Sequence, residues 1–507
     1  MLNQLFIPLA SKLFQAMCAR EYAAFRNSLA HPQAIQETVL RKLLKDLERT
    51  DYGKQYQING DEDYTAFSEK LPIQTYDSFE PWIQRQLHSG QTIITPYPVL
   101  HVEPTSGSSG PVKRIPYTRP LIQSFTRMFQ IWAYDQLKYG FQAKTGRIFM
   151  SISPPSGNPG FSDERDYLRE PFKTLVSPFL VLPPRRTQAL DFHKALALTL
   201  LQEERLEIIS IWSPSYLLAL LAYIDQNRDE LAALLPASKR MLGFVNGVDW
   251  QAVWPHLKLI SCWDNALAEP LAKRIRTLFP NVQVQGKGLL ATEAPMTVPL
   301  VGVEGHLPLV GELFMEFEMP DGDIKQLHEL QQGDQAQLII TQQAGLTRYR
   351  INDLVEVHGF CQNTPTLVFM GRANQVSDLA GEKLHERFVA QALMPLLPSG
   401  CFLLVPAEEP ELGYMLLIDT TYEELAEQAD RALCQAYHYG QARYLGQLKP
   451  LRVVQIADLL IKLQAFYQSQ GMKLGNIKDS ALMTDPAQGK KLLAFLIDSP
   501  DKTLLPA

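Results

Sequence analysis

Apolar residues in positions 1–50 recur every three or four residues, which is the spacing of one face of an α-helix. The stretch "ETVLRKLLKDLERT" continues this pattern to residue 50, and the following "DYGKQYQINGDEDY" interrupts it with glycine and an Asn-Gly pair. We therefore expect the chain to begin with helices. We expect the apolar face of the first of these helices to pack against the protein core, and docking on a membrane surface is the alternative. Its members are Leu2, Leu5, Phe6, Leu9, Leu13 and Met17.

Short apolar runs alternate with helical stretches between residues 96 and 291. Such alternation is typical of parallel strands joined by crossover helices. We expect strands in "PYPVLHVE", "TGRIFMSISPP", "LEIISIWSP", "HLKLISCW" and "VQVQGKGLLA". We expect helices in "RPLIQSFTRMFQIWAYDQLKYG", "YLLALLAYIDQN" and "LAEPLAKRIRTLF". This part of the chain is therefore predicted to be α/β.

The pattern changes from "HLPLVGELFMEFEM" to "TLVFMGR", where strand-like runs alternate with Asp-Gly and Gly-Phe turns and predict a β subdomain. Beyond Gly371, helix and strand patterns alternate again over about 135 residues, which is the size of one small domain. We therefore predict an α/β protein with two domains. The large N-terminal domain would comprise residues 1–371, and a small α+β C-terminal domain residues 372–507.

The amino-acid composition and the net charge exclude several classes of protein function. Hydrophobic residues make up 46% of the chain and charged residues 20%, as in ordinary globular proteins. The formal net charge of -6 argues against nucleic acid as a partner, and no apolar run reaches the roughly 18 residues that a membrane span needs.

The start of the chain lacks a basic residue before Lys12 and a small-x-small cleavage site, so we expect no secretion signal. Five scattered cysteines without CxxC spacing argue against disulfides or structural zinc and favour the reducing cytoplasm.

A loop rich in small residues, "PTSGSSGPVKRIPYT", follows the first predicted strand and precedes the helix that begins at residue 119. It does not match the Walker motif, because Lys113 is the sixth residue after Gly107 and is followed by Arg114. Its glycines nevertheless let backbone amides turn inward, and its hydroxyl and ammonium donors suit the phosphates of a nucleotide. A flexible linker is the alternative for this composition. The donors are Thr105, Ser106, Ser108, Ser109 and Lys113.

A second motif, "GLTRYRINDLVEV", places Tyr349 between Arg348 and Arg350, and Asp353 after the turn-forming Asn352. A carboxylate held on such a turn can accept hydrogen bonds from both hydroxyls of a ribose, while a tyrosine can cover a base. A charged surface turn is the alternative interpretation. The motif therefore makes Asp353 a candidate for binding a nucleotide.

Two further stretches carry candidate site residues. "GKGLLATEAP" places Thr292 and Glu293 directly after an apolar strand, where α/β proteins bind ligands. Mg²⁺ prefers one or two carboxylates together with phosphate oxygens, so Glu293 is a candidate ligand. "GRANQVSDLAGEKLHERF" places Arg372 and Lys383 at the start of the predicted C-terminal domain. For each of these residues, a solvated surface position is the alternative.

In this order, and together with "DYGKQYQI" and "LPIQTYDSFEPWI" upstream, the four stretches resemble the GH3 family of acyl acid amido synthetases over nearly the whole chain. GH3 proteins belong to the adenylate-forming superfamily, whose phosphate loop is similar to "SGSSGPVK", its acidic motif to "LLATEA" and its ribose motif to "RYRIND". The resemblance implies the acyl-CoA synthetase and luciferase-like architecture. It also implies a C-terminal domain that swings between two half-reactions, for which residues 371–378 are the predicted hinge.

The resemblance also implies roles for individual residues. The ATP phosphates are expected at the serines of the loop and at Lys113, phosphate and Mg²⁺ at Thr292 and Glu293, and the ribose at Asp353. Lys383, in "AGEKLHE", is the leading catalytic cation. Lys449 is a second candidate, since the family often has a lysine followed by x-Pro-Arg where this chain has "QLKPLR". The full set of expected nucleotide contacts is Thr105, Ser106, Ser108, Ser109, Lys113, Thr292, Glu293, Tyr349, Arg350, Asp353 and Arg372.

The implied reaction has two steps. A carboxylic acid attacks the α-phosphorus of ATP to give an acyl-adenylate and pyrophosphate, and an amino acid or other amine then takes the acyl group and releases AMP. The alternatives are transfer to a thiol such as coenzyme A and a nucleotide-binding sensor or scaffold without catalysis. The motif "ATE" replaces the "SSE" of plant members, so plant hormones are not implied as substrates. Aromatic residues are expected to wall the acyl pocket, namely Trp132, Phe149 and Trp212.

Overall fold

The computed structural model describes residues 2–105, 113–150, 170, 172–183, 192–236, 247–397, 401–408, 411–420, 424–472 and 477–498. The chain begins with helices, as the apolar periodicity predicts. Helix α1 is followed by α2, whose buried residues recur at helical spacing and include Val39, Leu43 and Leu47. These first elements are α1 (Leu2–Ser28), α2 (Pro32–Glu48), α3 (Asp51–Gln55), α4 (Tyr64–Lys70) and α5 (Tyr76–Ser89).

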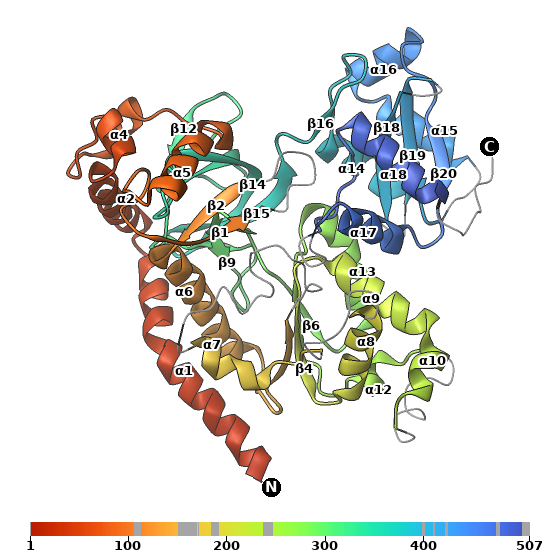
Figure 1. The fold of residues 1–507 in the computed structure, drawn as a ribbon, viewed down its shortest axis with the longest axis horizontal. Helices are drawn as coiled ribbons and strands as arrows, with labels where there is room; N and C mark the ends of the chain where they lie inside the picture. The colour runs from red at the N-terminus through yellow and green to blue at the C-terminus, as the bar shows by residue number, and fades with distance from the viewer. Residues whose placement is uncertain are drawn as a thin grey trace.

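The apolar face of α1 departs from the prediction of core packing. Cys18, Tyr22 and Phe25 are buried, whereas Leu9 and Leu13 are 68% and 63% exposed. Figure 1 shows the first turns of α1 extending away from the body of the molecule, so these turns have little protein surface to pack against. The later turns lie along α6 (Arg119–Asp135). The periodicity therefore predicted the helix correctly, but it predicted core packing for turns that are exposed.

The predicted parallel sheet is present with four of its five predicted strands, and the fifth, in "PYPVLHVE", lies instead in a separate antiparallel pair. Its four strands lie in the order β3-β4-β5-β6, and every neighbouring pair runs parallel. Strands β4 and β5 are buried along their whole length, because helices cover the sheet in this part of the molecule (Figure 1). The strands are β3 (Arg147–Met150), β4 (Leu206–Ser210), β5 (Leu259–Cys262) and β6 (Gln283–Gly286). The helices include α7 (Phe172–Val176), α8 (Phe192–Gln202), α9 (Pro214–Gln226), α10 (Arg228–Ala233), α12 (Trp250–Val253) and α13 (Glu269–Leu278).

The predicted β subdomain is an antiparallel sheet of five strands in the order β12-β11-β13-β14-β15. Side chains of β14 alternate between buried and less buried positions, which is the two-residue period of a strand with one face in the core. The strands are β11 (Phe314–Glu318), β12 (Ile324–Gln326), β13 (Gln335–Thr341), β14 (Tyr349–Cys361) and β15 (Thr364–Arg372). Short antiparallel pairs lie before them in the chain: β7 (Leu290–Ala291) with β8 (Ala294–Pro295), and β9 (Thr297–Val298) with β10 (Leu307–Pro308).

The loop that begins at Thr105 corrects one prediction. It joins two antiparallel strands, β1 (Val99–Pro104) and β2 (Arg114–Thr118), and α6 begins only after β2. The loop therefore closes a β-hairpin and does not lead from a strand directly into a helix. The backbone amide of Thr105 donates to the carbonyl of Lys113 (2.9 Å), which continues the ladder at the mouth of the hairpin. The sequence pattern missed β2 because Arg114 to Thr118 is too short a run to show a period.

The C-terminal part of the chain, from residue 373 onward, forms a lobe beside the parallel sheet, and we call it the C-terminal lobe (Figure 1). Its main sheet has the order β18-β19-β20, with β19 antiparallel to β18 and parallel to β20. The alternation of helix and strand predicted here is confirmed. The elements are β16 (Val376–Ser377), β17 (Leu384–His385), α14 (Glu386–Leu393), β18 (Phe402–Ala407), β19 (Gly413–Ile418), α15 (Leu425–Leu433), α16 (Tyr437–Tyr444), β20 (Arg452–Gln455), α17 (Leu459–Ser469) and α18 (Pro486–Asp498).

Buried apolar side chains show how the lobe sits on the rest of the molecule. One cluster lies wholly within the lobe and includes Leu393, Leu404 and Leu416. A second cluster runs from the parallel sheet into the lobe and includes both Ile260 and Leu403. The lobe therefore has a core of its own and also packs against the sheet. Within the described parts of the chain, no helix is both long and apolar enough to cross a bilayer.

Candidate active site

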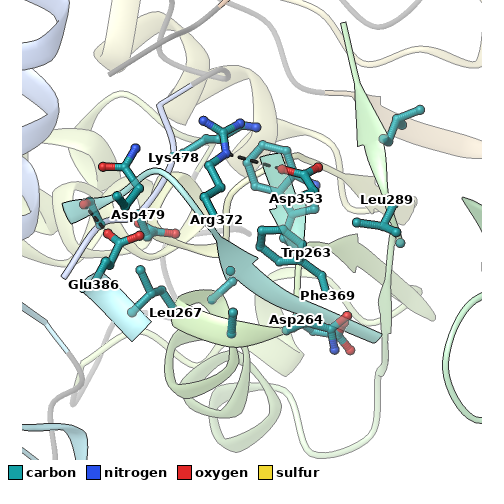
Figure 2. A pocket seen from close by; sticks show the side chains of 18 residues that line it. Trp263, Asp264, Leu267, Leu289, Asp353, Phe369, Arg372, Glu386, Lys478 and Asp479 are labelled. Carbon is teal, nitrogen blue, oxygen red and sulfur yellow. Dashed lines mark hydrogen bonds and ion pairs between the residues drawn. The ribbon is translucent and has the colours of Figure 1, made fainter. Parts of the chain in front are cut away.

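A pocket lies between the parallel sheet, the antiparallel sheet and the C-terminal lobe (Figure 2). Trp263 follows β5 and Leu289 follows β6, so the pocket opens at the carboxyl ends of parallel strands, where α/β proteins bind ligands. Asp353 and Phe369 enter it from β14 and β15, and Lys478 enters from the lobe. Residues from three parts of the chain thus meet at one site.

Asp353 is the buried carboxylate of this pocket. Its Oδ1 has no hydrogen-bond partner among the described residues, and Arg372 Nε lies 3.5 Å away, the ion pair drawn in Figure 2. Burial raises the pKa of Asp353, and the charges of Arg372 and Lys478 oppose that shift. A buried acceptor oxygen that lacks a donor is costly unless a ligand supplies one. The geometry therefore fits a ligand that brings hydroxyl groups to Asp353, as a ribose does.

A chain of polar contacts connects the hairpin loop to the acidic motif. Lys113 Nζ donates to Tyr349 Oη (2.8 Å), and the Tyr349 hydroxyl donates to Glu293 Oε1 (3.3 Å). Tyr349 is fully buried, with its ring packed against Phe79, and it does not line the pocket. This differs from the expectation of a tyrosine that covers a base. The Tyr349 hydroxyl instead links Lys113 to Glu293.

The two arginines of the motif "RYR" have structural partners. Arg348 is buried and contacts Glu316 with an Nη2–Oε1 distance of 2.8 Å. Arg350 contacts Glu318 with an Nη2–Oε1 distance of 2.6 Å and does not line the pocket. Successive side chains of a strand point to opposite faces, so Arg350 and its neighbour Tyr349 cannot face the same way. In this arrangement Arg350 pairs with Glu318 outside the pocket, and its contact with a nucleotide stays a prediction.

Thr292 and Glu293 form the turn between β7 and β8. Glu293 is buried, and the carbonyl of Thr292 accepts a hydrogen bond from the Tyr117 hydroxyl (2.8 Å), which fixes the turn to β2. The described residues contain no group of three or more His, Cys, Asp or Glu that would make a metal cage. A single glutamate at this turn suits Mg²⁺ that also binds phosphate oxygens.

Lys478 is the site residue that the sequence did not reveal. It lines the pocket, its ammonium lies 5.5 Å from the centre of the Trp263 ring, and its charge acts on Asp353. Burial, together with the charge of the nearby Arg372, lowers the pKa of Lys478 to about 8, whereas Asp353 and Glu293 oppose the shift. The surrounding sequence "NIKDSAL" has no proline or arginine like those of "QLKPLR", which drew attention to Lys449 although its proline is displaced from the family's x-Pro-Arg. Only tertiary packing distinguishes this lysine from the surface lysines of the chain.

The two predicted catalytic lysines lie elsewhere in this arrangement. Lys383 is exposed, with a φ of +45° in the turn before β17, and it is not among the pocket residues. Lys449 is also exposed, and its Nζ lies 3.3 Å from Glu411 Oε1. Of the loop residues, Thr105 closes the hairpin as described above. Ser106, Ser108 and Ser109 lie outside the described residues.

A second cavity adjoins the first across Leu290, which lines both. Met128, Phe129 and the predicted Trp132 enter this cavity from α6, and Lys287 enters it from the end of β6. Lys287 Nζ donates to Ser210 Oγ (2.8 Å) and lies 4.6 Å from the centre of the Trp212 ring. Phe149 is fully buried in the core of the parallel sheet and does not line the cavity. Of the three predicted wall residues, Trp132 thus lines this cavity and Trp212 borders it through Lys287.

Two family models match the chain. The GH3 family N-terminal domain matches residues 21–238, and the GH3 family central domain matches residues 308–372. The two matches together take in more than half of the 507 residues.

Named relatives resemble the chain over most of its length. Indole-3-acetic acid-amido synthetase GH3.3 of Arabidopsis thaliana is 22% identical over 427 residues, which cover 71% of this chain and 70% of that protein. Jasmonoyl-L-amino acid synthetase JAR4 of Nicotiana attenuata is 22% identical over 420 residues, which cover 70% of this chain and 71% of that protein.

Solved structures show the same fold. AtGH3.15 acyl acid amido synthetase in complex with 2,4-DB superposes with a TM-score of 0.77 at 17% identity, covering 95% of this chain and 96% of that one. A 2-hydroxyisobutyryl-CoA ligase in complex with 2-HIB-AMP gives a TM-score of 0.57 at 13% identity, with 93% and 94% coverage. The architecture of this chain is therefore shared with this amido synthetase and this CoA ligase. Together with the matching family models, it places this protein in the GH3 family.

Proposed function

We propose that the protein is an ATP-dependent acyl acid amido synthetase. It adenylates a carboxylic acid, transfers the acyl group to an amino acid or other amine, and releases pyrophosphate and AMP. The observation that carries this proposal is the pocket in which Asp353 Oδ1, which accepts no hydrogen bond from the described residues, lies near the cations of Arg372 and Lys478. A hydroxyl acceptor beside cations suits a nucleotide, and the named relatives in the family are amido synthetases.

ATP fits the residues of this pocket. Asp353 would accept hydrogen bonds from the ribose, and Arg372 and Lys478 would bind phosphate oxygens. Lys113, which lies outside the lining of the pocket, would bind phosphate oxygens from the hairpin loop. Trp263, Leu289 and Phe369 would provide apolar surface for the base. Thr105, Thr292 and the loop residues Ser106, Ser108 and Ser109 remain proposed donors to the phosphates.

Mg²⁺ is the proposed metal, with Glu293 as its protein ligand. The Tyr349 hydroxyl donates to one oxygen of this carboxylate, and the other oxygen can bind a cation. A metal held by one carboxylate and by phosphate oxygens neutralises charge where the triphosphate binds.

The first half-reaction brings two anions together, because the substrate carboxylate attacks the α-phosphorus of a triphosphate. Cations placed in advance offset this repulsion in the transition state. We propose Lys478 as the leading cation of this step, because it is the lysine that enters the pocket from the C-terminal lobe. In the second half-reaction the amine attacks the acyl carbon, and AMP leaves.

We propose for Lys383 a role that differs from that of Lys478. It lies close in sequence to the predicted hinge, residues 371–378, and is exposed in the present arrangement. A swing of the C-terminal lobe about that hinge is the motion that would carry Lys383 to the nucleotide. We therefore assign the described arrangement to adenylation and propose that Lys383 acts after the lobe moves.

The cavity lined by Trp132 and Lys287 is the proposed site for the acyl part of the acid. It is mostly apolar, and it adjoins the nucleotide pocket across Leu290, so an acid bound there could direct its carboxylate toward the α-phosphate. We propose the cytoplasm as the compartment of the protein. The five free cysteines agree with its reducing conditions.

A screen of pyrophosphate release tests this function. Full-length protein is given ATP, Mg²⁺ and a panel of carboxylic acids crossed with amino acids, and products are identified by mass. Coenzyme A replaces the amino acid in a parallel panel. We expect AMP, pyrophosphate and an amide. Formation of ADP would contradict adenylation, a thioester would favour the thiol acceptor, and ATP binding without turnover on any acid would favour a sensor.

A further inference from the structure

Three successive residues of the segment 477–482, Lys478, Asp479 and Ser480, line the pocket, and their other contacts reach different parts of the molecule. Lys478 enters the nucleotide pocket from this segment, as Figure 2 shows. Asp479 is hydrogen-bonded to Ser213, which lies 266 residues earlier in the chain. Ser480 is hydrogen-bonded to Glu386 of the C-terminal lobe. The segment is thus tied to the parallel-sheet region on one side and to its own lobe on the other.

The contact of Asp479 crosses from the lobe to the parallel-sheet region. Ser213 caps the N-terminus of α9, and its hydroxyl donates to Asp479 Oδ2 (2.8 Å). Ser213 Oγ also lies 2.5 Å from Ser215 Oγ, and the Ser215 hydroxyl hydrogen-bonds to Asp479 as well. Both serines are fully buried. A carboxylate at the positive end of a helix, bonded to two hydroxyls shielded from water, is held in one orientation.

Glu386 holds the following residues within the lobe. It accepts hydrogen bonds from Ser480 Oγ (2.5 Å) and from the backbone amide of Ala481 (3.0 Å). These contacts are internal to the lobe, so they persist wherever the lobe moves. Asp479 is different, because its contact with Ser213 exists only while the lobe sits on the parallel-sheet region.

We propose that Asp479 is a positioning residue for adenylation. Its bond to Ser213 and Ser215 fixes the backbone next to Lys478 and so directs the Lys478 ammonium into the nucleotide pocket. The contact breaks when the lobe swings away, so it acts in the first half-reaction and not in the second. This inference rests on the proposed function for its kinetic consequence, whereas the contact itself can be tested without substrate.

The surroundings of Asp479 determine which substitution is informative. Burial raises the pKa of Asp479 to about 6, so the carboxylate is mostly ionised at neutral pH and accepts both serine hydroxyl bonds. The other titratable groups near it are Lys478, Tyr467, Cys262 and Cys401. Asparagine keeps one acceptor oxygen of similar shape, whereas alanine removes both acceptors. Asp479→Asn should therefore preserve the orientation that Asp479→Ala loses.

The experiment compares Asp479→Ala, Asp479→Asn, Ser213→Ala and the double variant Ser213→Ala/Asp479→Ala in full-length protein. The matched control is Asp485→Asn, whose carboxylate accepts from the backbone of Ala487 at the start of α18. Hydrogen exchange of residues 477–482 is measured without substrate. Acid-dependent exchange of pyrophosphate into ATP, with an acid from the screen above, reports adenylation. Aminolysis of a synthetic acyl-adenylate reports the second half-reaction.

We expect Asp479→Ala to speed hydrogen exchange in this segment and to lower pyrophosphate exchange about tenfold to hundredfold, the usual effect of losing a hydrogen bond to a charged group. Aminolysis should stay near the wild-type rate, Asp479→Asn should recover most of the adenylation, and the double variant should lose no more than Asp479→Ala alone. Unchanged hydrogen exchange in Asp479→Ala, equal losses in both half-reactions, or no recovery with asparagine would overturn the proposal. A wild-type protein without pyrophosphate exchange on any acid would refute the proposed function, and the hydrogen exchange would still decide the contact.

Discussion

At the scale of single residues, chemistry depends on what surrounds a side chain more than on its type. Lys449 and Lys478 are both lysines of the C-terminal lobe. Lys449 is exposed and paired with Glu411, whereas Lys478 enters a pocket that also holds Asp353. Burial lowers the pKa of Lys478 to about 8, and a lysine with a perturbed pKa in a pocket is a candidate for a functional role.

The two lysines form a matched pair for mutation. We expect Lys478→Ala to lower acid-dependent pyrophosphate exchange by about 100-fold to 1,000-fold, since removal of one donor to a developing charge costs about 3 to 4 kcal/mol. Lys449→Ala should stay close to the wild-type rate, because its ion pair lies at the surface. A severe loss in Lys449→Ala with normal exchange in Lys478→Ala would reverse the two assignments.

The pH dependence of adenylation should report the titration of Lys478. Only the protonated ammonium is a cation, so raising the pH through about 8 removes positive charge from the pocket of the free enzyme. We expect kcat/KM for ATP to fall above that pH, since this parameter reports the groups of the free enzyme. In Lys478→Arg the fall should move to much higher pH, because arginine does not titrate in this range. An unchanged profile in that variant would exclude Lys478 as the titrating group.

At the scale of secondary-structure elements, the residues of one motif at the start of β14 make two kinds of contact. Asp353 faces the proposed nucleotide pocket, and Tyr349 holds Lys113 and Glu293. Arg348, which directly precedes β14, and Arg350 within it instead contact Glu316 and Glu318 of β11. The strand thus carries the site and also anchors it to the sheet, so the motif "RYRIND" has both a binding part and a structural part.

The two arginines should differ sharply in their effect on stability. Arg348→Ala would leave the buried Glu316 without its partner, and breaking a buried pair in this way costs about 3–5 kcal/mol. Arg350→Ala removes a more exposed pair, for which about 0–1 kcal/mol is usual. Urea unfolding followed by circular dichroism measures both. Equal shifts of the unfolding midpoint in the two variants would show that burial does not govern these pairs.

At the scale of the whole molecule, the site exists only where the lobe meets the two sheets. Asp353 and Arg372 come from the antiparallel sheet, Trp263 from the end of a parallel strand, and Lys478 from the C-terminal lobe (Figure 2). A lobe that moves would assemble and disassemble this pocket. Gly371, at the start of the predicted hinge, has a φ of +126°, a conformation that favours glycine.

Substitution of this glycine tests the hinge. A Cβ at Gly371 meets no atom within 4 Å, so Gly371→Ala would strain the backbone without a clash. We expect it to slow overall amide formation while the free energy of unfolding falls by about 1 kcal/mol. Gly446→Ala is the control, since Gly446 also has a positive φ of +73° and open space but lies between α16 and β20. Equal turnover in the two variants would place the hinge elsewhere.

The sequence by itself determined the elements and part of the site. Helices, parallel strands and the β subdomain follow from periodicity, because burial on one face sets the spacing of apolar residues along each element. Lys113, Glu293 and Asp353 were predicted as site residues because each lies in a short motif, and of these three Asp353 lines the pocket. The strand β2 was missed, since five residues are too few to show a period.

Only the tertiary structure decided which residues converge. It brought Lys478 to Asp353 across 125 positions of the chain, joined Asp479 to Ser213, and placed Lys383, Lys449 and Arg350 outside the pocket. Exposed turns and buried segments can carry the same lysine or arginine, so local sequence does not separate them. Convergence of distant residues depends on how sheets and lobes pack, and that packing is a property of the whole chain.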